Sequence, residues 1–331
     1  MGSKYENVGL SGLSNLGNTC FVNSCIQILY HTYDLVEFCE TLVQSDYNSD
    51  DDDYTLLKEW ISLKRVLWSK KCVVSPGRFI HILHIIASRK NSIFSEFSQN
   101  DSSEFLIFLL NAFHSGMPKI NNLQLSPPES NLDMICKNYV ESIAKRNDYS
   151  KIVELFYGVK VSILIKDDKV LSTVPESFFV FHLPMPEIKE PTIEQCFKLF
   201  MEDELLEKEN GLLNKETNKK EDVIKKTIIW EFPKILIVDF QRFRFNHIAR
   251  KKQNFIKFED HLKLTNYSGE VNNYELYGIS NHSGSVEGGH YTSFIKNMNG
   301  KWYHYNDTNV KEVPINDIFS SKAYCLFYRK I

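Results

Sequence analysis

Hydrophobic residues recur every three or four positions through much of the first 150 residues, a period that predicts helices packed on a core. The predicted helices cover about 19–31, a stretch ending near Leu42, 54–68, 79–87, a stretch starting near 100–101, and 132–143. The acidic stretch 45–53, which contains four consecutive aspartates, lies between the second and the third of them. Because like charges at that density repel, we expect this stretch to be an exposed loop.

From Glu154 onward the pattern changes from a helical period to alternation, which is typical of strands. Four apolar residues alternate with more polar ones up to a predicted hairpin turn at 166–169: Val159, Val161, Ile163 and Ile165. Further strands are predicted at 178–183 and within 232–243. Between them, Thr192 and Gln195 form a capping box that opens a helix reaching to about Glu207, and 211–226 is interpreted as a charged connection.

The composition is that of a soluble globular protein, with 43% hydrophobic and 24% charged residues among 331. The net charge of −3 does not favour nucleic acid as a partner, because nucleic-acid binding usually needs a concentrated positive surface. No apolar run approaches the roughly 18 residues of a membrane span, and the N-terminus lacks a signal-peptide pattern. The seven cysteines are scattered without any Cys-x-x-Cys pair, which predicts reduced thiols in the cytoplasm or nucleus.

A glycine-containing polar turn at 12–19 leads directly into the first apolar helix, and Cys20 lies at the junction. The start of a helix presents unpaired N–H groups and the positive end of the helix dipole, so we expect the thiolate of Cys20 to be favoured. Asn15, on the incoming turn, offers an uncharged N–H donor that could stabilise an oxyanion. Cys20 is therefore a candidate nucleophile, and the alternative is an ordinary buried cysteine of the core.

His290, near the other end of the chain, is a candidate base, and Asn306 and Asp307 are candidates to orient it. The two segments that carry these residues are predicted to pair as a hairpin that turns at Asn-Gly, residues 299–300. Tight pairing would place Asn306 opposite Ser293, so we expect a bulge or a splayed end to bring Asn306 to His290. A thiol, an imidazole and a group that orients the imidazole together make a nucleophilic triad.

Six blocks of this sequence resemble the ubiquitin-specific protease family of deubiquitinating cysteine proteases. They are residues 12–24 with Gln27, 99–106, 232–236, 241–243, 274–284 and 288–307. The blocks follow the family's order and cover nearly the whole chain. The resemblance implies an α+β fold, a papain-like right hand with a helical thumb at about 12–150 and a β palm with short β fingers at about 151–331. These parts would form a single catalytic domain after an N-terminal segment, 1–11.

The resemblance also implies the reaction, a thiol-dependent hydrolysis of the peptide or isopeptide bond after the C-terminal glycine of ubiquitin, through a thioester. Cys20 is expected to be the nucleophile, His290 the base and Asn306 the third member of the triad, its amide oxygen accepting from Nδ1–H of the imidazole. Asn15 and the backbone N–H of Cys20 would form the oxyanion hole. Asp307 is expected to point to the other face of the strand as a supporting residue, with the alternative that it is itself the partner of His290.

Four further residues are candidates to bind the substrate. Asp101 corresponds to the family residue that faces the arginine-bearing C-terminal tail of ubiquitin, and its alternative role is to cap the helix that begins beside it. Tyr291, Gly288 and Gly289 would line a channel so narrow that only residues without side chains, the terminal Gly-Gly of ubiquitin, pass it. The expected partners are ubiquitin and ubiquitinated proteins, with no nucleic acid and no membrane.

The family often ties the tips of its fingers with two Cys-x-x-Cys pairs on zinc, whereas the corresponding places here, 166–169 and 215–226, carry no cysteine. We therefore expect no structural zinc, no cofactor and short fingers. Two loops, the basic run 247–252 and the glycine-containing 282–289, are expected to flank the substrate tail. Two other functions stay open, a non-catalytic ubiquitin-binding scaffold of the same fold and a protease for another ubiquitin-like modifier.

Overall fold

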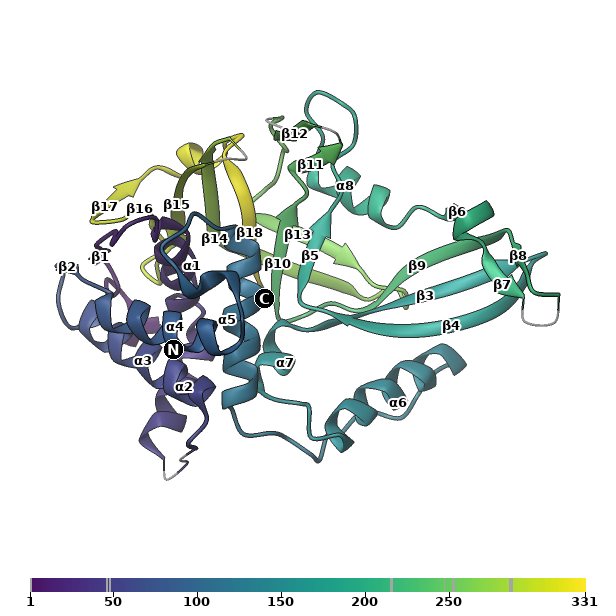
Figure 1. Cartoon of the computed structure of the whole chain (residues 1–331), viewed down its shortest axis with the longest axis horizontal. Helices are drawn as coiled ribbons and strands as arrows, with labels where there is room; N and C mark the ends of the chain where they lie inside the picture. Colours follow the sequence, from purple (N-terminus) through teal and green to yellow (C-terminus); the bar gives the residue numbers. More distant parts are fainter. Residues whose placement is uncertain are drawn as a thin grey trace.

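Helices and strands separate along the chain as the hydrophobic pattern predicts (Figure 1). The structure, a computed structural model, describes residues 2–45, 47, 49–214, 217–246, 248–251, 254–285 and 288–331. Within these residues the chain is mainly helical before Gly158 and mainly β after it. The predicted α+β fold class is therefore confirmed.

The helical half is built around α1, whose residues are all buried. Its helices are α1 (Cys20–Tyr30), α2 (Tyr33–Gln44), α3 (Asp52–Ser69), α4 (Gly77–Arg89), α5 (Ser102–Gly116), α6 (Asn131–Lys145) and α7 (Lys151–Phe156). Tyr30 of α1 stacks on Trp60 of α3 with ring centroids 4.8 Å apart, and Phe21 meets Phe105 of α5 edge-on at 5.3 Å. A helix buried on all sides is fixed by packing alone, so α1 is the central support of this half. No helix in the described part of the chain is long and apolar enough to cross a bilayer.

The acidic stretch before α3 is not a loop throughout, contrary to our prediction. The helix begins at Asp52, and the side chain of Asp51 caps it by accepting from the N–H of Asp53 at 2.9 Å. Asp52 pairs with Arg89, and the buried Asp53 pairs with Lys90 at 2.6 Å. Carboxylates are favoured at the start of a helix, and two cations at the end of α4 offset their mutual repulsion.

An eight-stranded sheet forms the palm. Its strands are β5 (Val180–Leu183), β10 (Ile235–Phe240), β13 (His261–Thr265), β14 (Val271–Gly284), β15 (Gly289–Lys296), β16 (Trp302–Asn306), β17 (Asn309–Val313) and β18 (Ala323–Lys330). They lie in the order β17-β16-β15-β14-β18-β10-β5, with β13 beside β14. Only β5 and β10 pair in parallel among these strands. The arrangement puts β15 and β16 near one edge and β5 at the other.

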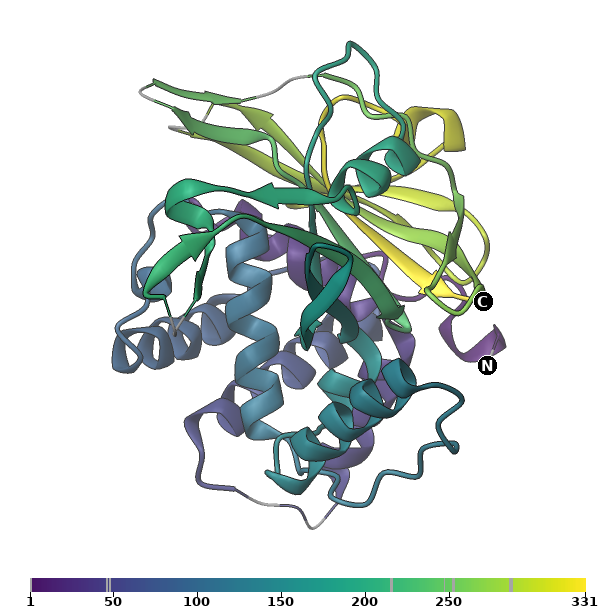
Figure 2. The same ribbon diagram turned by 90° about the vertical axis from the view of Figure 1, so that its right-hand side faces the viewer.

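The two faces of the palm have different neighbours. One face packs on the helical half, where α1 lies against β14 and β15 (Figures 1 and 2). The other face carries a second core with α8 (Ile193–Phe200). The predicted capping box of α8 is confirmed, because Thr192 accepts from Gln195 N–H and the Gln195 side chain accepts from Thr192 N–H. The helix ends at Phe200, well before the predicted end near Glu207, and the chain then enters a strand.

A second sheet projects from the palm as an arm (Figures 1 and 2). Its order is β4-β3-β9-β6, formed by β3 (Gly158–Lys166), β4 (Lys169–Phe178), β9 (Val223–Glu231) and β6 (Glu204–Leu206). The predicted hairpin between β3 and β4 is confirmed, with Asp167 and Asp168 at φ of 47° and 60°. The strands β3 and β4 have nine and ten residues, more than the usual five to six. Two long strands therefore form the body of the arm, and the expectation of short fingers stays a prediction.

The tip of the arm is ordered where we predicted a charged connection. The residues 211–226 contain β7 (Leu212–Asn214), β8 (Lys219–Glu221) and the start of β9, while 215 and 216 lie outside the described residues. Glu221 accepts from Lys166 at 2.7 Å and from Asn214 at 2.8 Å. Glu221 therefore ties this segment to the end of β3.

Two other expectations change, and short elements complete the fold. Residues near Glu154 form α7 instead of a strand, and 248–251 of the basic run pair with β11 instead of forming a loop, while 247 and 252 lie outside the described residues. The remaining elements are η1 (Gly2–Tyr5), β1 (Gly12–Leu13), β2 (Val73–Val74), η2 (Ile93–Ser95), η3 (Lys208–Asn210), β11 (Phe243–Asn246), β12 (Ile248–Lys251) and η4 (Ile315–Ile318).

The predicted N-terminal segment, 1–11, is described from residue 2 onward and contacts both halves of the fold. Tyr5 is buried and stacks on Tyr33 at the start of α2, with ring centroids 4.7 Å apart. Asn297, in the turn between β15 and β16, accepts from Asn7 N–H at 3.0 Å and donates to Val8 O at 2.8 Å. The segment thus joins the helical half to the turn of the β15–β16 hairpin.

Candidate active site

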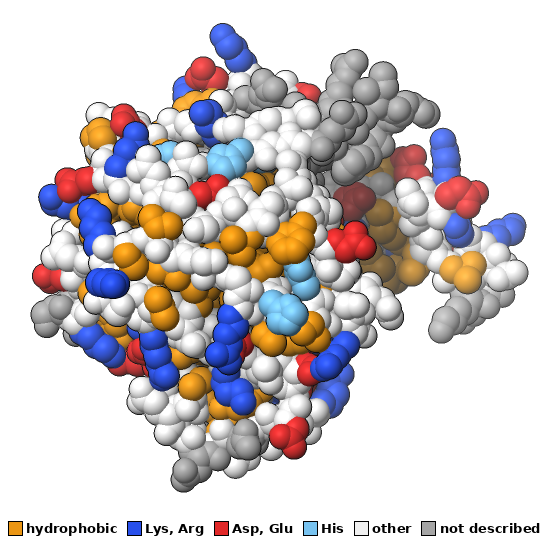
Figure 3. All heavy atoms as spheres, turned by 60° about the vertical axis from the view of Figure 1, so that its left-hand side comes forward, with side chains coloured by type: hydrophobic (Ala, Val, Ile, Leu, Met, Phe, Trp, Pro, Cys, Tyr) orange, Lys and Arg blue, Asp and Glu red, His pale blue; other side chains and the backbone are white. Residues whose placement is uncertain are grey.

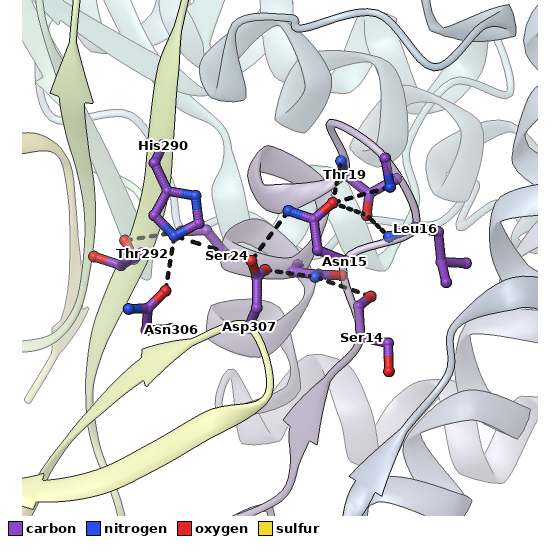
Figure 4. Close-up of polar contacts among 11 residues, drawn as sticks. Ser14, Asn15, Leu16, Thr19, Ser24, His290, Thr292, Asn306 and Asp307 are labelled. Atoms are coloured by element: carbon purple, nitrogen blue, oxygen red, sulfur yellow. Dashed lines mark hydrogen bonds and ion pairs between the residues drawn. The ribbon is translucent and has the colours of Figure 1, made fainter.

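The turn that leads into α1 is held by the side chain of Asn15. Its Oδ1 accepts from the N–H groups of Gly17 and Thr19, each at 3.1 Å (Figure 4). Gly17 and Asn18 have φ of 104° and 55°, a region that glycine and asparagine adopt more readily than other residues. Cys20 follows as the first residue of α1 and is buried. The helix begins at Cys20 because the polar turn before it has a left-handed backbone at Gly17 and Asn18, which is not helical.

Asp307 connects this turn to the palm, which differs from the expected orientation. Its Oδ2 accepts from Asn15 Nδ2 at 3.1 Å, and its Oδ1 accepts from Asn23 Nδ2 at 2.8 Å. The residue has φ of 48°, in the tight turn after β16, and its side chain is only 15% exposed. The left-handed backbone turns the carboxylate toward α1 instead of letting it follow the strand alternation. An amide nitrogen carries two hydrogens, so Asn15 keeps a second N–H for another acceptor.

His290 meets Asn306 through the nitrogen that we did not predict. Its Nε2 lies 2.7 Å from Asn306 Oδ1, with Asp307 Oδ2 farther away at 3.9 Å (Figure 4). An amide oxygen only accepts, so Nε2 carries the hydrogen, and the neutral ring keeps its lone pair on Nδ1. The expected bond from Nδ1–H is therefore wrong. The observed bond leaves Nδ1 as the basic nitrogen.

The register of the hairpin explains how Asn306 reaches His290, for which we predicted a bulge or a splayed end. The pairs between β15 and β16 contain no bulge. Lys296 pairs with Trp302 and Ser293 with Tyr305, so the loop spans 297–301 instead of the two residues of a tight turn. Continuing this register sets Asn306 level with Thr292, two residues from His290. Residues two apart share a face of a strand, so Asn306 and His290 are diagonal neighbours.

The free thiol of Cys20 is not activated in the way we expected. Burial raises the pKa of the Cys20 thiol above its ordinary value, while the backbone N–H of Tyr291 counteracts this and the charge of Asp307 adds to it. The helix start alone therefore does not stabilise the thiolate, since desolvation disfavours the charged form. Tyr291, the residue after His290, also lines the same cleft as Cys20.

A cleft of about 690 Å³ runs between the helical half and the palm beside Cys20. It brings together five of the nine predicted site residues: Cys20, Asp101, Gly288, Gly289 and Tyr291. The other four form the group of polar contacts drawn in Figure 4: Asn15, His290, Asn306 and Asp307. In the space-filling view the surface is hollowed between the body and the arm, with acidic side chains at the edge (Figure 3).

Asp101 caps α5 and also lies in the wall of the cleft. Its Oδ1 accepts from the N–H groups of Ser103 at 2.7 Å and Glu104 at 3.1 Å, which confirms the capping role. Its second oxygen accepts from the hydroxyl of Tyr324 on β18. Tyr291 is buried, and its hydroxyl accepts from Ser102 N–H at 3.4 Å. These bonds join the start of α5 to the palm beneath the cleft.

The two glycines before His290 lie where a side chain would collide. A Cβ on Gly288 would lie 2.7 Å from Oε1 of Gln99, and one on Gly289 would lie 2.3 Å from Nε2 of His282. Gln99 also accepts from Gly289 N–H at 2.8 Å, which links the loop before α5 to the palm. Sequence reasoning placed Gln99 in a family block but gave it no role. Residues 286 and 287 of the predicted loop 282–289 lie outside the described residues.

Sequence reasoning also missed His182 and Asp239, which line the same cleft as Cys20. Both stand inside segments for which we predicted strands and no functional side chain at these two positions. The available signal was the polar residue itself, because a charged side chain within a buried strand needs a partner. In the described part of the chain no group of three or more His, Cys, Asp or Glu side chains is arranged to hold a metal ion.

The fold and the site together define a papain-like right hand, with a cysteine at the start of a buried thumb helix and a histidine on the palm. The family model described as ubiquitin carboxyl-terminal hydrolase matches residues 11–328. The chain therefore belongs to the ubiquitin carboxyl-terminal hydrolase family.

Named relatives and solved structures agree with this assignment. Bovine ubiquitin carboxyl-terminal hydrolase 2 is 34% identical over 97% of this chain and 55% of its own length, and bovine ubiquitin carboxyl-terminal hydrolase 21 is 31% identical over 97% and 61%. The solved SAGA Ubp8/Sgf11/Sus1/Sgf73 DUB module bound to ubiquitin aldehyde matches with a TM-score of 0.76 at 25% identity, over 99% of this chain and 71% of that one. The chain thus spans little more than half the length of the first of these relatives.

Proposed function

We propose that this chain is a deubiquitinase that hydrolyses the bond after the C-terminal glycine of ubiquitin, with Cys20 as nucleophile and His290 as base. The observation that carries the proposal is the bond from His290 Nε2 to Asn306, which leaves Nδ1 basic, while Tyr291, the next residue in the chain, lines the same cleft as Cys20. Support comes from the relatives, which are named ubiquitin carboxyl-terminal hydrolases, and from a matching structure that holds ubiquitin aldehyde.

The first step follows from the burial of the thiol. Because the neutral form of Cys20 is favoured, His290 Nδ1 takes the Sγ proton as the sulfur attacks the carbonyl carbon of the terminal glycine. Asn306 holds the ring, and Asp307 places a carboxylate 3.9 Å from Nε2, close to the positive charge that develops on the ring during this step. The thiol is therefore activated during the reaction and not in advance.

The oxyanion is stabilised by Asn15 and by the backbone N–H of Cys20. Asn15 gives one N–H to Asp307, and its second N–H is the donor for the oxyanion. The imidazolium of His290 then protonates the leaving amine, and the C–N bond breaks to give a thioester on Cys20. Water adds to the thioester as His290 takes its proton, and the collapse releases the carboxylate and restores the thiol.

The cleft residues give the proposal its substrate class. Asp101, Tyr291, Gly288 and Gly289 all line the cleft and would hold the tail of ubiquitin there. We place the whole catalytic unit at 12–331, preceded by the segment 1–11. All seven cysteines are free thiols, which supports a reducing compartment, the cytoplasm or the nucleus.

The test is an adduct experiment with ubiquitin that bears a thiol-reactive electrophile at its C-terminus. We expect the protein to form a covalent adduct that the Cys20→Ala variant does not form. A matched probe built on another ubiquitin-like modifier serves as the control for the substrate. An adduct with that probe alone would move the substrate assignment, and binding of ubiquitin without any adduct would favour the non-catalytic scaffold.

A further inference from the structure

A row of polar side chains crosses the palm sheet under the start of α5. Cys325 on β18 pairs in register with Asp239 on β10, and Asp239 pairs with His182 on β5. Their neighbours on the same face, Val180 and Ile237, pack into the core of the helical half. The intervening residues of these strands face the second core on the other side of the palm. The side chains of Cys325, Asp239 and His182 therefore face the helical half, on the side of the sheet where the cleft lies.

The three side chains form a chain of hydrogen bonds from the core to the cleft. Asp239 Oδ1 accepts from Cys325 Sγ at 3.5 Å, and Asp239 Oδ2 lies 2.8 Å from His182 Nδ1. The side chain of Asp239 is 8% exposed, whereas that of His182 is 43% exposed. A carboxylate accepts from Nδ1–H, so neutral His182 carries its lone pair on Nε2, at the edge of the ring away from Asp239. The geometry therefore presents a fixed acceptor to the cleft.

The other charged groups of the cleft make it suitable for a cation. Asp101 and Glu104 stand at the start of α5, and Asp239 stands behind His182. Arg242 also lines the cleft, but it is buried and donates to Ala323 O at 2.8 Å and Asn254 O at 2.9 Å. Among the described residues that line the cleft, three carboxylates stand against one buried guanidinium, and this balance favours a basic ligand.

We propose that His182, oriented by Asp239, is a further specificity-determining residue that accepts a hydrogen bond from a basic side chain of the substrate's C-terminal tail when neutral and repels that side chain when protonated. The inference rests on the proposed function, since it names a contact for the tail that the deubiquitinase would bind. It assigns His182 a role in affinity and none in bond cleavage.

The sign of the pH dependence follows from the surroundings of the ring. The hydrogen bond to Asp239 raises the pKa of His182, and burial raises the pKa of Asp239. The charged and titratable groups that line the cleft around His182 come from several elements: Asp101, Glu104, Asp239, Arg242, His282, Tyr291 and Tyr324, with Cys325 behind Asp239. Because the pKa of His182 is raised, its cationic form persists to higher pH. The affinity of the protein for a basic tail therefore falls as the pH is lowered through the pKa of His182.

The experiment measures the dissociation constant of ubiquitin for the Cys20→Ala protein between about pH 6 and 8.5, where no turnover occurs. We expect affinity to fall about threefold to tenfold toward pH 6, as a protonated ring faces a cation across the cleft. The additional change His182→Gln keeps an acceptor that does not titrate, so this fall should disappear. Asp239→Asn removes the charge that holds the proton on His182, so the fall should shift to lower pH.

Two controls separate the outcomes. Ubiquitin whose tail arginines are replaced by leucine should bind the His182→Gln variant and the protein that retains His182 equally well, and the melting temperature of each variant checks its folding. An unchanged pH dependence in His182→Gln would overturn the inference. Failure of the Cys20→Ala protein to bind ubiquitin at any pH would defeat the proposed function, whereas binding with no effect of His182 would defeat this inference alone.

Discussion

The cysteine side and the histidine side of the candidate site are held by different means. Cys20 begins a helix of 11 buried residues, so its backbone is fixed by packing in the centre of the thumb. His290 lies near the end of a hairpin with its side chain 42% exposed, and its orientation depends on strand register and one bond to Asn306. Asp307 joins the two sides by accepting from Asn15 and Asn23. Alignment of the site should therefore be most sensitive to substitutions where the hairpin meets α1.

The largest effect should come from removing the link. Asp307→Ala releases Asn15 and Asn23 and takes away the charge near the imidazole, so we expect kcat to fall by about 10³-fold. Asn306→Ala, the matched change one residue earlier, loses only the ring contact and should lower kcat by about tenfold to 10²-fold. Steady-state kinetics on ubiquitin with a fluorogenic C-terminal group measures both. A greater loss of kcat in Asn306→Ala than in Asp307→Ala would show that the bonds from Asp307 to Asn15 and Asn23 are not the most sensitive part of the site.

A smaller effect is expected from the cysteine side itself. Asn15→Ala removes one donor of the oxyanion hole, which typically lowers kcat by about 10²-fold to 10³-fold with little change in KM. The same change also deletes the brace of the turn, since Asn15 accepts from Gly17 and Thr19. Asn15→Asp keeps these acceptors, loses both N–H donors and sets a second carboxylate against Asp307, so kcat should stay low. Recovery of kcat in Asn15→Asp would assign Asn15 to bracing the turn alone.

The smallest effect concerns the influence of the Asp307 carboxylate, on the histidine side, on the pKa of Cys20. Asp307 raises the pKa of Cys20, so at a given pH it lowers the fraction of reactive thiolate. Asp307→Asn should lower that pKa and increase the rate of alkylation by iodoacetamide at about pH 8 roughly twofold to threefold. The Cys20→Ala protein gives the background from the six other cysteines. Slower alkylation in Asp307→Asn would contradict the prediction that Asp307 raises the pKa of Cys20.

The helical half could be predicted largely from the sequence because its elements follow one local rule. A buried amphipathic or apolar period extends through α1, α3, α4 and α5, and the predicted ranges fall within a few residues of the observed ones. The failure at the acidic stretch came from partners distant in sequence. Asp53 is stabilised by Lys90, 37 residues later, and no local pattern reports that pair.

The palm could be predicted less well because register is set by contacts far apart in the chain. The loop 297–301 replaces a tight turn while Asn297 and Asn299 bond to Asn7 and Val8, about 290 residues away. That shift of one residue decides which face carries Asn306. The sequence was enough to identify the candidate site residues. Their contacts, including which nitrogen of His290 meets Asn306, depend on this register and could not be predicted.

The bonds from Asp307 to Asn15 and Asn23 span 292 and 284 residues of chain. A ribosome that adds about 5–20 residues per second needs roughly 15 s to a minute to make that length. Throughout this time the cysteine turn exists without the strand that completes it. Cys20 is therefore without the carboxylate that joins its turn to the palm until the 292 residues that separate Asn15 from Asp307 have been made.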